Sequence, residues 1–303
     1  MSPPIIVGID PLRHDPEAPV LAALLARATG APVLAVAAYE TLHRLGSAHE
    51  YEPRGAALAR LSAIEAAFHG LTRETAAISG SSAACVLHDC AADRGAGLLV
   101  VGATHDGVMG MLALGSTADR LLHGTTCPVA VAPLGFAERM RGIDRVGVAF
   151  IESEEGEEAL RAAAALASAC GAELYAATAV EPLPWSASRL APPYDVEAHL
   201  KHQRQQAETT LRRALDDVRP RVESHIEVLV DPPVIALEQF SNEVDLLVCG
   251  SRGYGPLGSV LLGGVSRRLA HRAACPVIVV PRGTERQLEA LAGAAVAMES
   301  GHA

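Results

Sequence analysis

One sequence pattern occurs twice in this chain of 303 residues. Residues 98–133, LLVVGATHDGVMGMLALGSTADRLLHGTTCPVAVAP, align without a gap with residues 246–281, LLVCGSRGYGPLGSVLLGGVSRRLAHRAACPVIVVP. The glycines, an arginine, a histidine and the tripeptide Cys-Pro-Val recur in register, which chance does not explain. An internal repeat of this kind decides the architecture before any single element does. The chain is therefore a tandem duplication, with domains expected at 1–137 and 142–283 and a tail at 284–303.

Apolar runs alternate with helical stretches along each half, a pattern that indicates βαβ crossovers and a parallel sheet. Runs such as LLVV and PVIVV are apolar on both faces, as burial between two helical layers requires. The sequence predicts an α/β fold of two tandem doubly wound, five-stranded parallel sheets. The tail should be a loosely attached helix or disordered. The expected strands are 5–10, 33–39, 72–78, 97–102 and 128–133, then 144–150, 173–180, 222–230, 245–250 and 276–281.

Charge and hydropathy exclude several classes of protein. The formal net charge is −10, whereas a nucleic-acid-binding protein needs a basic face. The start, MSPPIIVGID, has no basic residues and reaches an aspartate before a signal-peptide core could form. No uncharged apolar run reaches the roughly 18 residues of a membrane span. We therefore expect a cytoplasmic protein that binds neither nucleic acid nor membrane.

A glycine pattern follows the expected fourth strand of the second half. Gly250, Gly253 and Gly263 have the spacing G-x2-G-x9-G just before an expected helix. Ligands of open parallel sheets bind at the carboxyl ends of strands, and the unpaired N–H groups of a helix start favour an anion. Glycine permits positive φ and lets phosphate approach the backbone. The alternative is a merely flexible loop before a capped helix. Hydroxyl groups that could donate to phosphate or cap the helix follow the glycines at Ser116 and Thr117 in the first half and at Ser266 in the second.

Other phosphate and catalytic motifs are absent from the sequence. A P-loop needs a lysine directly after its glycines, and the single lysine, Lys201, lies elsewhere. The six cysteines form no C-x-x-C pair and are interpreted as small hydrophobes. His199 and His202 are better explained by a solvated helix face than by a metal. His123 and His271 recur near a helix end, which favours a structural or capping role.

With these motifs in this order, the chain resembles the universal stress protein family in its tandem form, over about 3–133 and 143–281. The resemblance implies the strand order 3-2-1-4-5 and an adenine nucleotide alpha hydrolase-like fold. It also implies ATP, with or without Mg²⁺, held between the end of the first strand and the glycine loop, with no catalytic residue and no protein-bound metal. The positions implied for nucleotide contact are Asp10, Gly102, Gly115, Ser116 and Thr117 in the first half, and Gly250, Arg252, Gly253, Gly263, Gly264, Val265 and Ser266 in the second.

Neither half carries the complete family pattern. The first half has Asp10 where ATP-binding members have an aspartate, but His105 replaces the second glycine of its loop. The second half has the three glycines, but Phe150 replaces the aspartate and Gly264 replaces a hydroxyl residue. Because several backbone donors act together on the phosphates, the second half is expected to bind ATP more tightly.

Three functions follow as hypotheses. The first is a nucleotide-dependent stress-response switch with at most weak ATPase activity. The second is a degenerate tandem protein that binds no nucleotide and acts through protein contacts. The third is an enzyme of related architecture that uses an adenylate or a flavin.

The fifth strand of each half should be an apolar sheet edge, and an open edge invites pairing. Family members cover this edge with a second copy of the domain. We therefore expect residues 128–133 to pair with 276–281 inside one chain, and a homodimer of whole chains is also expected.

Overall fold

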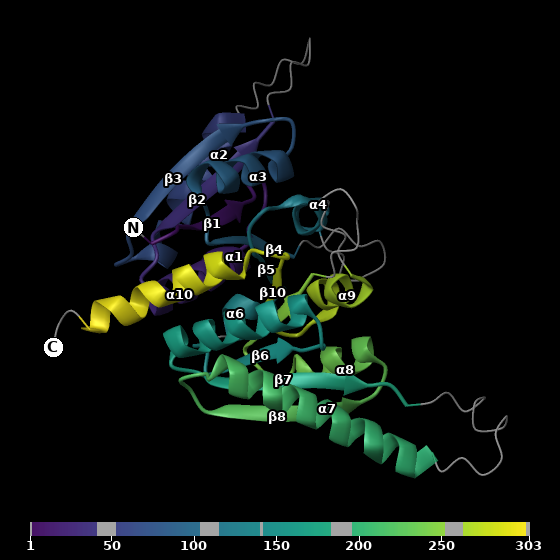
Figure 1. Ribbon diagram of the computed structural model, residues 1–303. Coiled ribbons are helices and arrows are strands. Elements are labelled where there is room, and N and C mark those ends of the chain that lie inside the picture. The colour runs from purple at the N-terminus through teal and green to yellow at the C-terminus, as the bar shows by residue number, and fades with distance from the viewer. Residues whose placement is uncertain are drawn as a thin grey trace.

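A computed structural model describes residues 2–40, 53–103, 115–139, 142–182, 196–251 and 263–300. Strands and helices alternate along each half, as the sequence predicts (Figure 1). The strands are β1 (Ile5–Ile9), β2 (Val33–Tyr39), β3 (Arg73–Ser79), β4 (Leu98–Gly102), β5 (Val129–Ala132), β6 (Arg145–Ala149), β7 (Glu173–Val180), β8 (Ser224–Val230), β9 (Leu246–Gly250) and β10 (Val277–Val280). The helices are α1 (Glu17–Thr29), α2 (Pro53–Ala63), the 3₁₀ helix η1 (Glu65–Phe68), α3 (Ala83–Arg94), α4 (Ser116–Gly124), α5 (Phe136–Arg139), α6 (Glu154–Cys170), α7 (Val196–Val218), α8 (Pro233–Phe240), α9 (Gly264–Arg272) and α10 (Glu285–Ser300).

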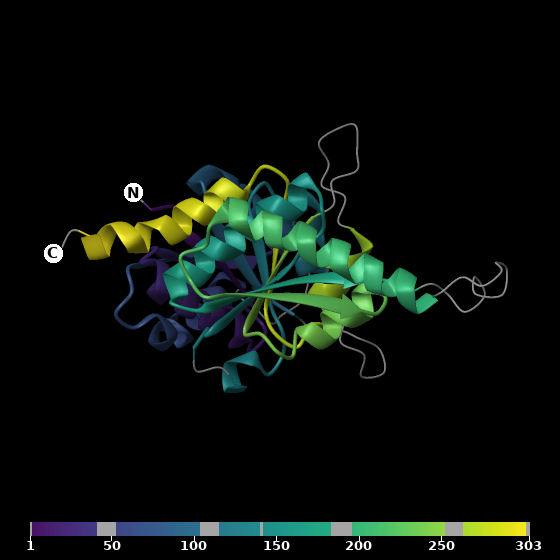
Figure 2. The same cartoon turned by 60° about the horizontal axis from the view of Figure 1, so that its bottom comes forward.

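The strands form one sheet in the order β3-β2-β1-β4-β5-β10-β9-β6-β7-β8. Within each half all neighbouring strands are parallel, and each half has the expected order 3-2-1-4-5. Helices cover both faces of the sheet, as the second view makes clear (Figure 2). The prediction of two tandem doubly wound parallel units is confirmed.

An antiparallel pairing of β5 with β10 joins the two halves. Val277 lies opposite Val131, and Ile278 lies opposite Ala130. These residues are at most 2% exposed, so the junction lies inside the molecule. This ladder is the contact expected between 128–133 and 276–281, and it makes one continuous sheet from the two repeats.

The core is aliphatic and has one layer on each face of the sheet. One buried cluster gathers side chains from α1 and α6, and the other gathers side chains from α3, α4, α8 and α9. Alanine predominates on the buried faces of α1 and α6, for example at Ala22 and Ala163. Small side chains let these helices pack close to the strands.

The C-terminal tail is more ordered than the sequence suggests. Helix α10 packs along α6 of the second half and also contacts α1 of the first (Figure 1). Leu288 and Leu291 are completely buried, and a Cβ atom at Gly97 would lie 2.8 Å from Leu291 Cδ1. The helix expected as one alternative for the tail is present. It is not loosely attached over residues 285–292, because apolar residues three and four apart form a stripe that other helices cover.

Candidate functional site

The candidate site lies at the carboxyl edge of the sheet. In the first half β1 pairs in parallel with β4, and in the second half β6 pairs with β9, so each pair of strands ends at one edge. Helices α4 and α9 begin after the glycine loops that leave β4 and β9. Arg252, Gly253 and His105 lie outside the described residues, as does most of both glycine loops. The other positions implied for nucleotide contact are described.

Gly102 and Gly250 end β4 and β9, and the protein itself crowds both. A Cβ atom at Gly250 would lie 2.6 Å from the backbone oxygen of Glu155, in the first turn of α6. At Gly102 it would collide with the carboxylate of Asp15. Neither glycine is among the described glycines with positive φ. Gly250 thus does not use the positive φ that glycine permits. Its lack of a side chain is explained by the Glu155 backbone at the start of α6, and at Gly102 the Asp15 carboxylate occupies the same place.

Asp10 follows β1 directly and turns its carboxylate toward its own loop. Its Oδ1 accepts hydrogen bonds from the backbone N–H groups of Leu12, at 2.8 Å, and Arg13, at 3.2 Å. Phe150 holds the corresponding place after β6 and is only 4% exposed, within the buried cluster that contains residues of α6 and α7. The aspartate of the first half thus has no polar counterpart in the second, and the Phe150 ring belongs to the core.

Asp15 is a second carboxylate at the same edge, and sequence reasoning missed it. It lies against Gly102, and its Oδ1 accepts the backbone N–H of Glu17 at 3.0 Å. Burial raises the pKa of Asp15, and the charges of Glu17 and Asp10 raise it further. The available signal was a carboxylate two residues before a helix, a position where aspartate commonly accepts backbone hydrogen bonds.

The start of α4 offers donors that no described side chain caps. Its N-cap residue is Gly115, which has no side chain to satisfy the first N–H groups. Ser116 is exposed and Thr117 is half-buried, and neither hydroxyl has a hydrogen-bond partner among the described residues. Free N–H groups and hydroxyls at a helix start suit a phosphate or another anion.

The start of α9 has the same backbone but different side chains. Its N-cap is Gly263, and Gly264 is exposed. Ser266 is 5% exposed and donates its hydroxyl to the backbone oxygen of Gly250 at 2.7 Å, so this hydroxyl is already in use. Val265 packs against the core. Ser251, just after β9, has a buried hydroxyl oxygen without a partner among the described residues, so a ligand could satisfy it.

Several of the remaining cysteines and histidines are buried or contact the backbone or a neighbouring side chain. Desolvation raises the pKa of Cys127, Cys249 and Cys275 to about 12, so these thiols stay protonated at neutral pH. His123 Nδ1 lies 2.6 Å from the backbone oxygen of Asp119, one turn earlier in α4. His271 Nε2 lies 3.9 Å from Asp119 Oδ1, across the junction between the halves. Among the described residues, no helix combines the length and hydropathy needed to cross a membrane.

Parallel strands in the order 3-2-1-4-5, with helices on both faces, define an adenine nucleotide alpha hydrolase-like fold. Comparison with known proteins agrees at the level of sequence. The model of the universal stress protein family matches residues 1–133 and 142–281. The chain belongs to the universal stress protein family, in its tandem form.

Individual relatives support the assignment to the family. A universal stress protein of Mycolicibacterium smegmatis is 31% identical over 215 residues, which cover 70% of each chain. One from Thermus aquaticus is 34% identical over 136 residues, 44% of this chain and 95% of that protein. A local match to one from Mycobacterium tuberculosis H37Rv is 44% identical over 54 residues, only 18% of each chain. The crystal structure of a universal stress protein from Archaeoglobus fulgidus has a TM-score of 0.65 at 20% identity and covers 92% of this chain and 98% of its own.

Proposed function

We propose that this protein binds an adenine nucleotide, ATP, and acts as a nucleotide-dependent stress-response switch with little or no turnover. The observation that carries the proposal is the start of α4, which lies at the sheet edge that Asp10 shares. Among the described residues, no side chain caps its first N–H groups, and the hydroxyls of Ser116 and Thr117 have no partner. A helix start of this kind favours phosphate oxygens, and a carboxylate can accept hydrogen bonds from a ribose or an adenine.

The described contacts favour the first half, which is the reverse of the order expected from sequence. In the second half the Ser266 hydroxyl is engaged with Gly250, and Phe150 is packed in the core. Among the described side chains there, the Ser251 hydroxyl has a buried oxygen without a partner. We therefore assign the nucleotide to the first half, with Asp10, Gly102, Gly115, Ser116 and Thr117 as its contacts. Gly250, Arg252, Gly253, Gly263, Gly264, Val265 and Ser266 form a second, weaker candidate.

The Asp15 carboxylate bears on whether Mg²⁺ accompanies the nucleotide. It lies against the end of β4, where its charge would oppose the phosphates. Mg²⁺ prefers oxygen ligands and commonly bridges a carboxylate to phosphate oxygens. We propose Asp15 as the residue that would hold Mg²⁺ beside ATP. Calorimetry with and without Mg²⁺ should then give tighter binding with the cation, and equal affinities would remove Asp15 from this role.

Slow or absent hydrolysis follows from the same residues. Phosphoryl transfer needs charge-neutralising and water-positioning groups around the γ-phosphate. The sequence has no lysine at either glycine loop, and the first carboxylate oxygen of Asp10 accepts hydrogen bonds from its own loop. A phosphate-release assay should show turnover well below the usual enzymatic range of about 1 s⁻¹ or more.

The direct test is the ligand that the purified protein carries. After denaturation, released adenine nucleotide together with ATP binding by calorimetry would support the switch. A protein that releases no ligand and gives no heat with ATP would overturn the proposal in favour of a scaffold that acts through protein contacts. Released flavin would instead favour the enzyme. We also propose a cytoplasmic location. We further propose a dimer of chains, which light scattering during gel filtration would check.

A further inference from the structure

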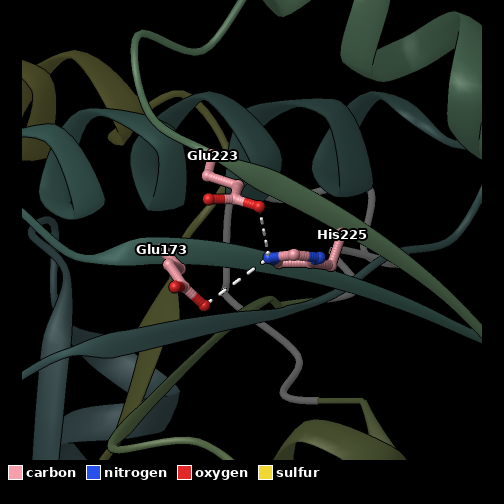
Figure 3. A group of neighbouring side chains, drawn as sticks. All are labelled: Glu173, Glu223 and His225. Carbon is pink, nitrogen blue, oxygen red and sulfur yellow. Dashed lines mark ion pairs between the residues drawn. The ribbon is translucent and has the colours of Figure 1, made fainter.

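Three metal-ligating side chains meet at the opposite end of the second half, at the start of β7 and β8. Glu173 is the first residue of β7, Glu223 directly precedes β8, and His225 is its second residue. The register places Tyr175 opposite His225, and Leu174 opposite Ser224. Glu173 and Glu223 are thus also neighbours, and side chains two residues apart on a strand share a face. Figure 3 shows the imidazole between the two carboxylates.

The distances between the imidazole nitrogen and the two carboxylates suit coordination of a shared metal ion better than hydrogen bonding. His225 Nε2 lies 3.5 Å from Glu173 Oε2 and 3.8 Å from Glu223 Oε1, and the three possible ligand atoms lie within 4.8 Å of one another. Hydrogen bonds of this type measure about 2.7–3.2 Å. Ligand atoms bound at about 2.1 Å to a tetrahedral zinc ion are about 3.4 Å apart. Small side-chain adjustments would bring all three atoms onto one ion.

His225 Nε2 is the least satisfied atom of the group. It is buried and has no hydrogen-bond partner among the described residues, although the side chain as a whole is 37% exposed. If this nitrogen carries no proton, its lone pair faces two carboxylates. If it carries a proton, the N–H has no acceptor at hydrogen-bond distance. A cation bound by the nitrogen and both carboxylates would satisfy all three groups.

Neighbouring side chains hold the group in place. The Tyr175 ring stacks on the His225 ring, with centroids 4.5 Å apart and planes at 26°. Its hydroxyl donates to Glu173 Oε2 at 2.7 Å, and this bond raises the pKa of Tyr175. Contacts of this kind orient metal ligands and are themselves important for affinity. The group is therefore positioned before any ion arrives.

The surrounding charges are mixed. The Arg145 guanidinium lies 5.6 Å from the centre of the Tyr175 ring. Glu227 follows His225 on the same face of β8, and burial together with Glu243 raises its pKa. Two carboxylates, at 173 and 223, thus lie beside His225, whereas Arg145 lies over the neighbouring Tyr175 ring.

We propose that Glu173, Glu223 and His225 form a binding site for a divalent transition-metal ion of the zinc type, with water in the remaining positions. A mixed imidazole and carboxylate set suits zinc and its transition-metal neighbours, whereas Mg²⁺ and Ca²⁺ favour sites made of oxygen alone. The site lies at the amino ends of its strands, away from the edge assigned to the nucleotide, so the two proposals stand or fall separately.

The test is a zinc titration of the full chain after treatment with a chelator. We expect one Zn²⁺ per chain. His225→Gln and Glu173→Gln should each weaken binding by about tenfold or more, and Tyr175→Phe by about 10–100-fold through its outer contact. His202→Gln removes an exposed histidine of α7 and serves as the matched control, with unchanged binding. Circular dichroism would show that each variant is folded.

Cobalt substitution separates this site from the six cysteines. Bound Co²⁺ should give visible d–d bands without thiolate charge transfer, and these bands should vanish in His225→Gln. The proposal is overturned if the wild type binds no zinc, if His225→Gln binds as well as the wild type, or if the cobalt spectrum carries thiolate bands.

Discussion

At the scale of single residues, the strand-end glycines show how one pattern can have two causes. Gly102 and Gly250 belong to a spacing typical of phosphate loops, yet each is crowded by the start of a helix from its own half. Asp15 fills this place in the first half and the Glu155 backbone fills it in the second. Packing against the Glu155 backbone therefore explains the missing side chain at Gly250, and at Gly102 a side chain would have to displace the Asp15 carboxylate.

Gly250→Ala should destabilise the fold. The added Cβ would lie 2.6 Å from the backbone oxygen of Glu155, and overpacking of this kind costs about 1–3 kcal/mol. Gly264→Ala is the matched control, because no atom of the described residues lies within 4 Å of its Cβ position in α9; it should be neutral or stabilising by about 0.5–1 kcal/mol. Urea denaturation measures both, and equal stabilities for the two variants would refute the packing explanation.

Asp15→Asn should stabilise the protein at neutral pH. Burial raises the pKa of Asp15 in the folded state, with smaller contributions from Glu17 and Asp10. The folded chain therefore holds a proton on the Asp15 carboxyl group more tightly than the unfolded chain does. Wild-type stability then falls as pH rises from about 4, the unfolded value, through the higher folded value. Asparagine keeps an acceptor for the Glu17 N–H. Urea midpoints measured from pH 3 to 8 should be higher for the variant than for the wild type only as the pH rises. A variant that is less stable than the wild type at pH 7 would contradict this.

At the scale of elements, sequence periodicity was sufficient for the strands and for most helices. Each expected strand is present within a residue or two of its bounds, because apolar runs between helical stretches suit only a doubly covered parallel sheet. The sequence predicted helix α10 as one alternative for the tail, but not its firm attachment. Its partners, α6 and α1, lie far away in sequence, and no local pattern names a distant partner.

The sequence also did not predict the contacts between elements at the candidate sites. The Glu17 carboxylate accepts a hydrogen bond from the backbone N–H of Gly135, and the Glu158 carboxylate accepts one from Gly283. In both halves a buried glutamate thus binds the turn after the fifth strand. The engagement of Ser266 with Gly250 likewise depends on tertiary packing. Sequence identified the edge at which a ligand would bind but not which of its polar groups the fold had already used.

Leu291→Ala tests the attachment of α10. Leu291 is completely buried and lies where a side chain at Gly97 would be, and truncation of a buried leucine costs about 2–5 kcal/mol. Arg286→Ala, on the exposed side of the same helix, should change stability by less than about 0.5 kcal/mol. Thermal or urea unfolding would decide, and a Leu291→Ala protein as stable as the Arg286→Ala protein would show that α10 contributes nothing to the fold.

At the scale of the whole molecule, duplication has produced one continuous sheet from two units that have diverged. The junction of β5 with β10 buries the edge that each unit would otherwise expose. Asp119 of α4 also bonds Arg267 of α9 across the junction, with 3.2 Å between Oδ1 and Nε. Because the two halves share one sheet, one half can lose contacts to a ligand and still pair with the other half. The burial of Phe150 and the hydrogen bond of Ser266 to Gly250 are consistent with such a loss in the second half.

The stoichiometry of ATP binding tests this account most directly. Calorimetry of the wild type should give one ATP per chain. Asp10→Ala should reduce affinity about tenfold or more, since a charge-assisted hydrogen bond is worth about 1.5–3 kcal/mol, while Gly263→Val in the second half should leave binding unchanged. A stoichiometry of two, or a site that survives Asp10→Ala and disappears in Gly263→Val, would contradict the assignment of the nucleotide to the first half.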